Sequence, residues 1–354
     1  MESFCLQEED SITVSLTDTL ASEPKDGVFD VLIIGSGPSG LTAAIYTTRG
    51  ALSTLVLAGS KWGGQLQLTT DVENFPGFPQ GIQGPELMQK MREQAERFGA
   101  KINDVDVESV DFSGGEIGGI RVFRVMGDGK THMAKAVIIA TGADTKWLGL
   151  ESEQRLIGRG VSSCAPCDAP FFKDKRVVVV GGGDSAMEEA LVLTKYATSV
   201  TIIHRRNEFR ASDIMQKKVF DNPKIKIQWN TEVVEILGEE RVVGIKIKGT
   251  QSGEEKGMEV DGVFVAIGHT PSTNIFKGKI ELDEKGYVKK NQKLKIEMQN
   301  GEEGNFQTAT SVPGIFVAGD VHDYHYRQAI TAAGYGCQAA MDLEKWLGVD
   351  PATR

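Results

Sequence analysis

The pattern of hydrophobic and polar positions along the chain predicts an α/β protein. Short apolar runs that are rich in β-branched residues and bounded by glycine are typical of buried parallel strands. Such runs occur at residues 30–34, 54–59, 136–143, 176–180, 200–203, 263–269 and 314–320. Helical patterns are found at residues 41–46, at residues 86–92 with charges on one face, and from residue 327 onward.

Two further stretches alternate apolar and polar positions, as antiparallel strands do. They span residues 101–135 and 228–264. Because each half of the chain then combines parallel strands with such a layer, the chain repeats one architecture. We therefore predict two Rossmann-like nucleotide-binding domains, each with an antiparallel β layer, the second inserted in the first.

The predicted domain borders follow the buried strands. The first domain is discontinuous and takes residues 28–145 and 275–354, and residues 146–274 form the inserted domain. Residues 1–27 are predicted to be a disordered tail, because the first 26 residues are acidic and lack an apolar core. The same composition argues against a secretory signal or a transit peptide.

Composition narrows the classes of function. The 354 residues suffice for two domains, and the 41 glycines fit a nucleotide-binding α/β protein. The formal charge of -10 argues against a nucleic-acid partner, and no apolar run reaches the length of a membrane span. Two of the four cysteines, Cys5 and Cys337, are isolated, so a reducing, cytoplasmic location is predicted, with Cys337 packing as a small apolar residue.

A glycine turn joins the first predicted strand to the first helix: Gly35-Ser36-Gly37-Pro38-Ser39-Gly40. The glycines of this fingerprint allow a tight turn, a close approach to a pyrophosphate and close packing of helix on sheet. The strand at residues 54–59 ends without the acid that would hold a ribose. The fingerprint alone therefore leaves NAD and FAD both open for this site.

A second fingerprint follows the strand at residues 176–180, with Gly181, Gly183 and an alanine, Ala186, in its last position. The next strand leads into basic residues where an NAD site would carry an acid: His204, Arg205 and Arg206, with Arg210 further on. Planar guanidinium groups suit a 2′-phosphate, so NADPH is predicted rather than NADH. A solvated basic corner is the alternative interpretation.

Two cysteines, Cys164 and Cys167, are separated by two residues just ahead of this second fingerprint. This spacing near a helix start favours the thiolate and thus a redox-active pair, and Pro166 suits a first helical turn. Asp168 is placed to move protons to or from a thiol. The alternatives are half a zinc site and a helix N-cap. Zinc requires four ligands, and no His pair follows at finger spacing, so we predict no metal.

Several loops and strand ends are further candidates for ligand contacts. The Gly- and Pro-rich loops at residues 62–65 and 71–79 could bind a ligand or merely connect elements. Asp320, at the end of the last strand, can accept from a ribitol or ribose hydroxyl, and the helix after Arg327 begins next to it. His269 follows a strand and is interpreted as structural.

These motifs together resemble those of the low-molecular-weight flavoprotein thioredoxin reductases, over nearly all of the chain after residue 27. The matching stretches are residues 35–40, 63–65, 72–77, 140–143, 164–168, 181–186, 204–206 with Arg210, and 318–329. The resemblance implies FAD in the discontinuous domain, NADPH in the inserted domain, a homodimer, and thioredoxin as the protein substrate. It also implies that the inserted domain rotates, because nicotinamide and dithiol cannot occupy the same face of the flavin together.

The resemblance implies a role for each matching residue. The residue matching Cys167 meets the flavin, the one matching Cys164 attacks the thioredoxin disulfide, and Asp168 matches the acid. FAD would be held by Gly35, Ser36, Gly37, Pro38, Ser39, Gly40, Gly63, Gly64, Gln65, Thr70, Asn74, Thr141, Gly142, Asp320, Arg327, Gln328 and Ala329. NADPH would be held by Gly181, Gly183, Asp184, Ser185, His204, Arg205, Arg206, Arg210, Ile267 and Gly268. Phe171 and Phe172 fall where the family presents aromatic residues to thioredoxin, or are simply packed.

The chain also departs from the family. Pro166 and Ala169 differ from the commoner residues, Pro170 stands where an aromatic is often found, and the charged residues 289–305 have no assigned role. A reductase of another small disulfide protein is therefore an alternative. A flavin-dependent dithiol oxidase would be expected to lack the NADPH arginines, and a redox-sensing regulator on this fold would be expected to lack an intact dithiol or its acid.

Overall fold

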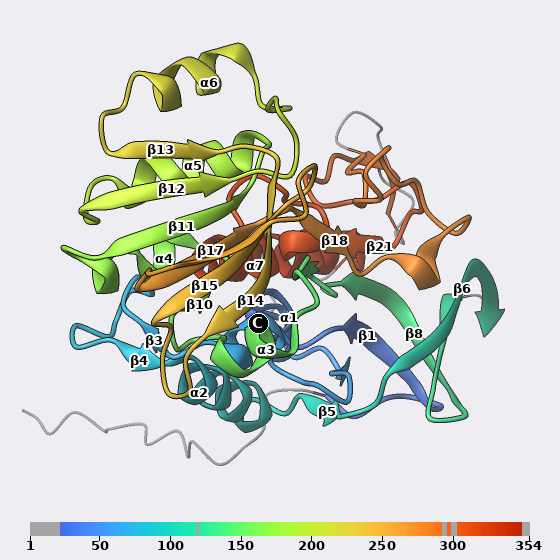
Figure 1. The fold of residues 1–354 in the computed structure, drawn as a ribbon. Coiled ribbons are helices and arrows are strands. Elements are labelled where there is room, and N and C mark those ends of the chain that lie inside the picture. The colour runs from blue at the N-terminus through green and yellow to red at the C-terminus, as the bar shows by residue number, and fades with distance from the viewer. Residues whose placement is uncertain (1–21, 118–119, 292–295, 299–302, 349–354) are drawn as a thin grey trace, which may run out of the picture.

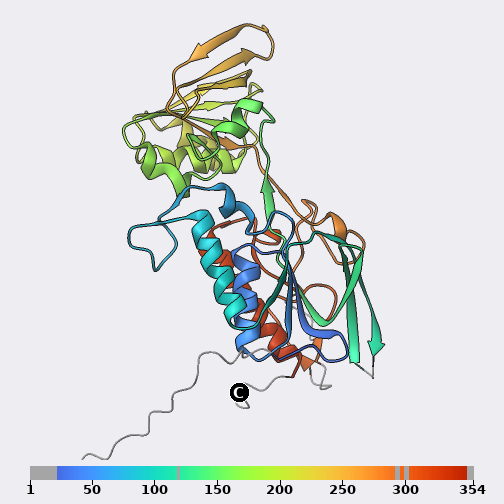
Figure 2. The same cartoon turned by 90° about the horizontal axis from the view of Figure 1, so that it is seen from below.

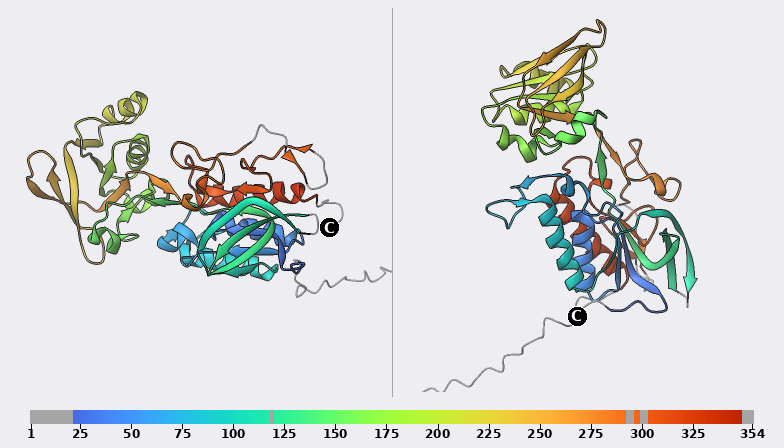
Figure 3. Two further views of the ribbon diagram at one scale, coloured as in Figure 1. Left: turned by 90° about the vertical axis from the view of Figure 1, so that its right-hand side faces the viewer. Right: turned by 60° about the horizontal axis from the view of Figure 1, so that its bottom comes forward.

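A mixed sheet in one α/β unit and a parallel sheet in the other form the frame of the computed structural model (Figure 1). The structure describes residues 22–117, 120–291, 296–298 and 303–348. Figures 2 and 3 show the units as two separate bodies that meet at a narrow waist. The predicted fold class is confirmed, because the strands of the second unit lie in the chain between two neighbouring strands of the first sheet.

The sheet of the first unit has seven strands, and its long strand β8 belongs to two patterns at once. The order is β5 (Lys101–Asn103), β2 (Thr54–Leu57), β1 (Val28–Ile34), β8 (Lys130–Ile139), β7 (Ile120–Gly127) and β6 (Val107–Ile117), and β21 (Ile315–Val317) also pairs with β8. β8 is parallel to β1 and β21 but antiparallel to β7. The antiparallel layer expected from residues 101–135 is therefore continuous with the parallel sheet.

Three helices cover one face of this sheet, side by side, with α1 between the other two (Figure 2). They are α1 (Pro38–Arg49), α2 (Gly84–Arg97) and α7 (Ala329–Trp346). Side chains such as Val31 and Ile33 pack beneath them, while Leu32 and Ile34 point to the other face, against Phe112 and Phe123 of the β6–β7 layer. This alternation follows from the pleat of β1.

The second unit repeats the plan with a five-stranded parallel sheet. Its order is β10 (Val161–Ser162), β17 (Gly262–Ala266), β11 (Arg176–Gly181), β12 (Ser199–Ile203) and β13 (Ile225–Gln228). Helices α4 (Ala165–Asp168), α5 (Asp184–Leu193) and α6 (Asp213–Phe220) belong to one side of it. The other side is covered by the predicted antiparallel layer, with helix α3 (Glu151–Leu156): β14 (Thr231–Leu237), β15 (Gly244–Gly249) and β16 (Glu255–Met258).

Both passages of the chain between the units run through one antiparallel pair of short strands. These are β9 (Ala143–Thr145) and β18 (His269–Pro271). β9 ends at the predicted border after residue 145, and β18 lies shortly before the predicted border after residue 274. The positions of both borders stay predictions. The remaining short elements are β3 (Asp71–Val72), β4 (Ile82–Gln83), β19 (Ile296–Glu297), β20 (Glu303–Gly304), and the 3-10 helices η1 (Gly64–Leu68), η2 (Ala169–Phe172), η3 (Asn274–Phe276) and η4 (Gly319–Val321).

The ends of the chain are described only in part. Residues 1–21 of the predicted tail lie outside the described residues, and so does part of the charged segment 289–305. From residue 22 on, the chain contacts the first unit: Ser22 donates to Asp30, and Glu23 forms an ion pair with Lys101 at 2.5 Å. Among the described helices, none is both long and apolar enough to cross a membrane.

Candidate functional site

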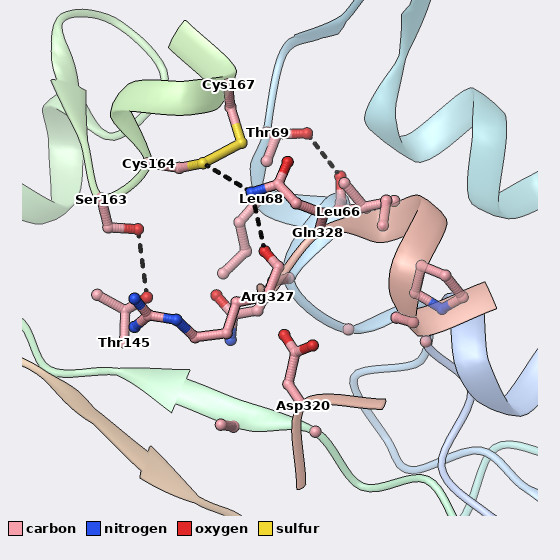
Figure 4. Close-up of a pocket in the computed structure, with 18 of the residues that line it drawn as sticks. Leu66, Leu68, Thr69, Thr145, Ser163, Cys164, Cys167, Asp320, Arg327 and Gln328 are labelled. Atoms are coloured by element: carbon pink, nitrogen blue, oxygen red, sulfur yellow. Dashed lines mark hydrogen bonds between the residues drawn. A yellow bond between two sulfur atoms is a disulfide. The ribbon is translucent and has the colours of Figure 1, made fainter. Parts of the chain in front are cut away.

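A cavity of about 420 Å³ lies at the carboxyl ends of β1, β8 and β21 and is also lined by residues of the second unit. Figure 4 shows part of its lining, with Asp320 and the Cys164–Cys167 disulfide. Ligands of doubly wound sheets bind at such edges. The cavity brings together most of the residues predicted to hold FAD: Gly35, Ser36, Gly37, Pro38, Ser39, Gly64, Gln65, Thr70, Asn74, Thr141, Gly142, Asp320, Arg327, Gln328 and Ala329. It also contains the three predicted catalytic residues, Cys164, Cys167 and Asp168.

The three glycines of the first turn have different roles. Gly35 has a φ of 107°, and a Cβ there would lie 2.3 Å from the carbonyl oxygen of Ala140. A Cβ on Gly40 would lie 2.1 Å from the carbonyl oxygen of Gly35, so this glycine allows α1 to approach the strand. A Cβ on Gly37 would meet nothing within 4 Å. Gly37 thus leaves open space on the cavity side, which suits a ligand approaching the backbone.

Two predicted FAD residues, Gly40 and Gly63, support the cavity without lining it. Gly63 has a φ of 87° and donates its N–H to Ser36 Oγ at 2.9 Å. Ser36 in turn donates to the carbonyl oxygen of Ala58 at 2.8 Å. These bonds hold the loop after β2 against the glycine turn.

Asp320 carries an unsatisfied acceptor inside the cavity. It follows β21 in η4, and its Oδ1 is buried with no hydrogen-bond partner among the described residues. Burial, with Asp323 nearby, raises the pKa of Asp320 to about 7, while Arg327 opposes the rise. A buried carboxyl oxygen without a partner is costly unless a ligand hydroxyl satisfies it.

Arg327 and Gln328, the two residues directly before α7, reach toward the second unit (Figure 4). Arg327 takes a φ of 46° and contacts the imidazole of His269 on β18. Burial, with Arg327 and Lys146 nearby, lowers the pKa of His269 to about 4, so the neutral ring can accept from the guanidinium. His269 is therefore a contact of Arg327, in keeping with its structural interpretation.

Gln328 links the start of α7 to the disulfide. It is the N-cap of α7 and forms a capping box with Thr331. Its Nε2 lies 3.8 Å from Cys164 Sγ, and its Oε1 accepts from Asn74 Nδ2 at 3.2 Å. The amide thus joins the predicted loop at residues 71–79, the helix and the redox pair in one contact network.

Cys164 and Cys167 form a disulfide that faces the cavity (Figure 4). Cys164 is the N-cap of α4, and Pro166 stands in the first turn of this short helix, as predicted. The disulfide fits the redox interpretation of the pair. Over the residues that the structure describes, no group of three or more His, Cys, Asp or Glu side chains is arranged to hold a metal ion.

Asp168 lies beside the disulfide in a setting that favours its protonated form. Burial raises the pKa of Asp168, and a hydrogen bond with Ser162 opposes the rise only in part. Ser162 Oγ also accepts from the N–H of Cys164 at 3.0 Å. Asp168 can therefore hold a proton close to the thiols that form when the disulfide opens.

Glu189 is a second carboxyl at the disulfide that sequence reasoning missed. It comes from α5, lines the cavity, and its Oε2 accepts from the N–H of Ala165 at 2.5 Å. The sequence signal for it was a pair of acidic residues, Glu188 and Glu189, in an otherwise apolar helical segment. The face on which it lies could not be assigned without the contact between α4 and α5.

The second fingerprint lies at the carboxyl ends of β11, β12 and β17. A Cβ on Gly181 would lie 2.4 Å from the carbonyl oxygen of Ala266, whereas a Cβ on Gly183 would meet nothing within 4 Å. As in the first turn, the first glycine lies against a neighbouring strand end and the second leaves open space for a ligand. Asp184 and Ser185 follow in the first turn of α5, where Asp184 accepts from the N–H and Oγ of Ser212.

The predicted basic residues divide into an exposed group and a buried one. Arg205, Arg206 and Arg210 are exposed. His204 is only 6% exposed, and its ring packs against Phe209 and Trp229. The side chain of His204 turns into the core beneath the glycine turn, where a Cβ on Gly182 would lie 2.2 Å from the imidazole ring. That His204 helps to hold NADPH stays a prediction.

The structure describes all the residues predicted to hold NADPH, and none of them lines the cavity. Ile267 is exposed, and Gly268 has a φ of 109° and accepts from the N–H of Lys146 at 2.9 Å. In this arrangement the cavity therefore contains the disulfide and excludes the second glycine turn.

Three predictions near the motif and in α7 can be compared with the structure. Phe171 is 38% exposed, while Phe172 is buried against Phe264 with ring centroids 5.0 Å apart. Of the two aromatics, Phe171 is thus available to a partner and Phe172 is packed. Cys337 is half-buried on α7 rather than fully packed, with its Sγ 3.8 Å from Met341 Sδ.

Comparison with known proteins gives a consistent result. A family model described as pyridine nucleotide-disulphide oxidoreductase matches residues 29–336. The chain is 51% identical to a thioredoxin reductase of Mycolicibacterium smegmatis over 320 residues, which cover 90% of this chain and 97% of that protein.

Two solved structures show the same fold to different extents. A thioredoxin reductase of Giardia duodenalis is 41% identical, with a TM-score of 0.80 and coverage of 90% of this chain and 99% of that one. A thioredoxin reductase of Lactococcus lactis described as the FR conformation is 36% identical, with a TM-score of 0.57 and the same coverage. At the same coverage, the second structure thus superposes less well on this chain than the first.

Proposed function

This chain belongs to the pyridine nucleotide-disulphide oxidoreductase family, among its thioredoxin reductases, and we propose that it reduces thioredoxin at the expense of NADPH through bound FAD. The observation that carries the proposal is the Cys164–Cys167 disulfide, which faces the same cavity as the first glycine turn and Asp320. A dithiol pair is thereby placed where a flavin could reach it.

The residues of the cavity fit FAD. Asp320 Oδ1 is a buried acceptor that a ribityl hydroxyl would satisfy, and the open space at Gly37 would admit the pyrophosphate. Gln65, Thr141 and Gln328 line the rest of the cavity. When bound, FAD accepts a hydride from NADPH and supplies two electrons to a disulfide.

NADPH is proposed for the second glycine turn. Gly183 leaves the start of α5 open, and Arg205 and Arg206 stand exposed just after β12, where the 2′-phosphate of the adenosine would lie. The fork of an arginine can bind a phosphate in a bidentate manner. The presence of these arginines also disfavours a dithiol oxidase, which would not need them.

The chain's own groups would carry the exchange with thioredoxin. Once the disulfide is reduced, the Cys164 thiolate attacks one sulfur of the substrate disulfide, and a mixed disulfide forms as the other substrate sulfur leaves. Cys167 then attacks Cys164 Sγ, which restores the disulfide and releases the substrate as a dithiol. Asp168, whose pKa is raised by burial, would supply and recover a proton at Cys167 Sγ.

We propose that the second unit turns relative to the first during each cycle. The disulfide lines the cavity while the second glycine turn does not, so hydride transfer requires another arrangement of the units. The lower TM-score of the Lactococcus lactis structure supports the existence of such an arrangement in the family. The paired strands β9 and β18 are the candidate hinge, since both crossings pass through them.

A homodimer and a cytoplasmic location remain proposals. Helix α7 presents Ile330 and Met341 to solvent, and Tyr46 on α1 is 44% exposed beside it. These side chains could form part of the contact with a second copy, which sedimentation equilibrium would test. A cytoplasmic location agrees with the free thiol of Cys337, and cell fractionation would check it.

The test of the proposed function follows the absorbance of the flavin in the purified holoenzyme without oxygen. NADPH is expected to reduce the flavin, and oxidised thioredoxin is expected to reoxidise it. In Cys164→Ser, reduction should persist and reoxidation by thioredoxin should be lost, whereas Cys337→Ser should behave as wild type. Reduction without reoxidation in the wild-type protein would reject thioredoxin in favour of another small disulfide protein. No reduction at all would reject the NADPH reductase.

A further inference from the structure

Two carboxyl groups, rather than one, lie at the disulfide. Asp168 belongs to the motif itself, and Glu189 comes from α5, which packs against α4 on the same side of the sheet. The N–H of Ala165 donates to Glu189 Oε2 at 2.5 Å. Ala165 is buried and immediately follows Cys164, so this bond fixes the backbone on which Cys164 is carried.

Holding a backbone N–H does not by itself require a carboxyl, because the amide oxygen of a glutamine would accept the same bond. Unlike the amide of glutamine, however, the carboxyl of glutamate can lose its charge by binding a proton. Burial raises the pKa of Glu189 to about 7, with Asp168 and Glu188 adding to the rise and the Ala165 bond and Arg327 opposing it. Glu189 therefore changes its charge close to neutral pH.

The other elements packed on α5 bring few charges to this place. Strands β12 and β17 and the helix η2 carry no ionisable side chain, and on β11 only Arg176, at its far end, is charged. The charged residues of α6 are exposed: Asp213, Lys217 and Lys218. The charge around the disulfide is thus determined mainly by Asp168, Glu188, Glu189 and Arg327.

We propose that Glu189 is a positioning residue for Cys164: it holds the backbone next to this cysteine, and its charge raises the pH at which the Cys164 thiol ionises. The proposal rests on the proposed function in that it takes Cys164 as the attacking sulfur. Opening the disulfide takes up two electrons, which come from NADPH in the proposed function, and two protons, and it gives two thiols. The Cys164 thiol then releases its proton to solvent to become the thiolate, and no further reactant is needed.

The direction of the effect follows from like charges. An ionised Glu189 and a Cys164 thiolate repel each other, so each raises the pH at which the other loses its proton. Replacing Glu189 by glutamine keeps an acceptor for Ala165 and removes the charge. The Glu189→Gln variant should therefore form the Cys164 thiolate at lower pH than the wild-type residue allows.

The test measures alkylation of Cys164 by iodoacetamide as a function of pH. The flavin-loaded protein carries Cys167→Ser, so Cys164 is the only thiol of the pair, and mass spectrometry of its peptide separates it from Cys5 and Cys337. The midpoint of the rate is expected to fall by roughly half to one pH unit in Glu189→Gln. The matched control is Glu188→Gln, an exposed neighbour on the same helix with the same change of charge, which should shift the midpoint less than Glu189→Gln does.

Two further outcomes decide the role of the charge. Glu189→Asp keeps the charge but shortens the side chain, so it should retain a midpoint close to the wild-type one even if it loses the bond to Ala165. An unchanged midpoint in Glu189→Gln, or an equal shift in Glu188→Gln or Glu189→Asp, would overturn the proposal. The measurement uses neither NADPH nor thioredoxin, so failure of the proposed substrate would leave its result intact.

Discussion

Gly35 lies directly against Ala140, where the turn after β1 meets the end of β8. A Cβ on Gly35 would come within 2.3 Å of the Ala140 carbonyl oxygen, and the φ of Gly35 is 107°. Gly37, in the same turn, has a φ of -67° and open space at its Cβ position. The fold therefore requires a glycine at position 35, whereas the neighbouring atoms leave room for a side chain at position 37.

Alanine at these two positions should separate folding from cofactor binding. Gly37→Ala is expected to leave the free energy of unfolding of the flavin-free protein unchanged and to weaken FAD binding roughly 10- to 100-fold, because the new methyl occupies ligand space. Gly35→Ala should instead lower the free energy of unfolding by about 2 kcal/mol or more. Urea denaturation and fluorescence titration with FAD measure the two effects. Normal FAD affinity in Gly37→Ala would contradict the placement of the pyrophosphate.

The two exposed arginines after β12 should determine the choice of nucleotide. Replacing Arg205 and Arg206 together by alanine is expected to raise the KM for NADPH roughly 10- to 100-fold, because charge-assisted hydrogen bonds to the 2′-phosphate are lost. The KM for NADH should change little. Arg241→Ala removes an exposed arginine from the same unit and serves as the control. Equal losses for both nucleotides would reject the 2′-phosphate assignment.

Asp320 should make the flavin-free protein less stable as the pH rises. Its pKa is about 7 in the folded protein against an ordinary value of 3.8. Between these values the folded state holds a proton that the unfolded state has released, so the free energy of unfolding falls with increasing pH. Asp320→Asn removes this contribution and is expected to stabilise the flavin-free protein by roughly 1 to 3 kcal/mol above about pH 7, with no gain in acid.

The same substitution should weaken FAD binding, since the acceptor of the ribityl hydroxyl is altered. Thermal unfolding of the flavin-free protein across pH, together with FAD titration, tests both halves of this prediction. A variant that gained no stability at neutral pH would show that the pKa of Asp320 is not raised in the folded protein. A variant with wild-type FAD affinity would remove Asp320 from the proposed site.

Local motifs made much of the fold predictable from the sequence. The two glycine turns were recognisable because a turn between a strand and a helix requires particular backbone angles, as Gly35 illustrates. The CxxC pair was recognisable by its spacing alone, and the structure closes it as a disulfide. Buried parallel strands were visible as apolar runs because both faces of such a sheet are covered.

What could not be predicted depends on contacts between distant segments. β8 was expected as two pieces, since its alternating start and its apolar end have different local patterns, yet pairing with β7, β1 and β21 makes it one strand. His204 follows a strand just as Arg205 does, and only the packing of Phe209 and Trp229 draws its ring inward. Glu189 was missed because its partner is a backbone N–H on another element.

Helix α5 begins at the second glycine turn and carries Glu189 against the backbone of the CxxC motif. A nucleotide held at Gly183 and the Cys164–Cys167 pair therefore belong to one rigid body and must move together. Given the proposed turning of that body, an engineered cross-link that fixed the two units in the present arrangement would trap the enzyme. If its flavin were reduced before cross-linking, such a protein could reduce its disulfide once. It would then stop, because bound NADPH could not reduce the flavin again.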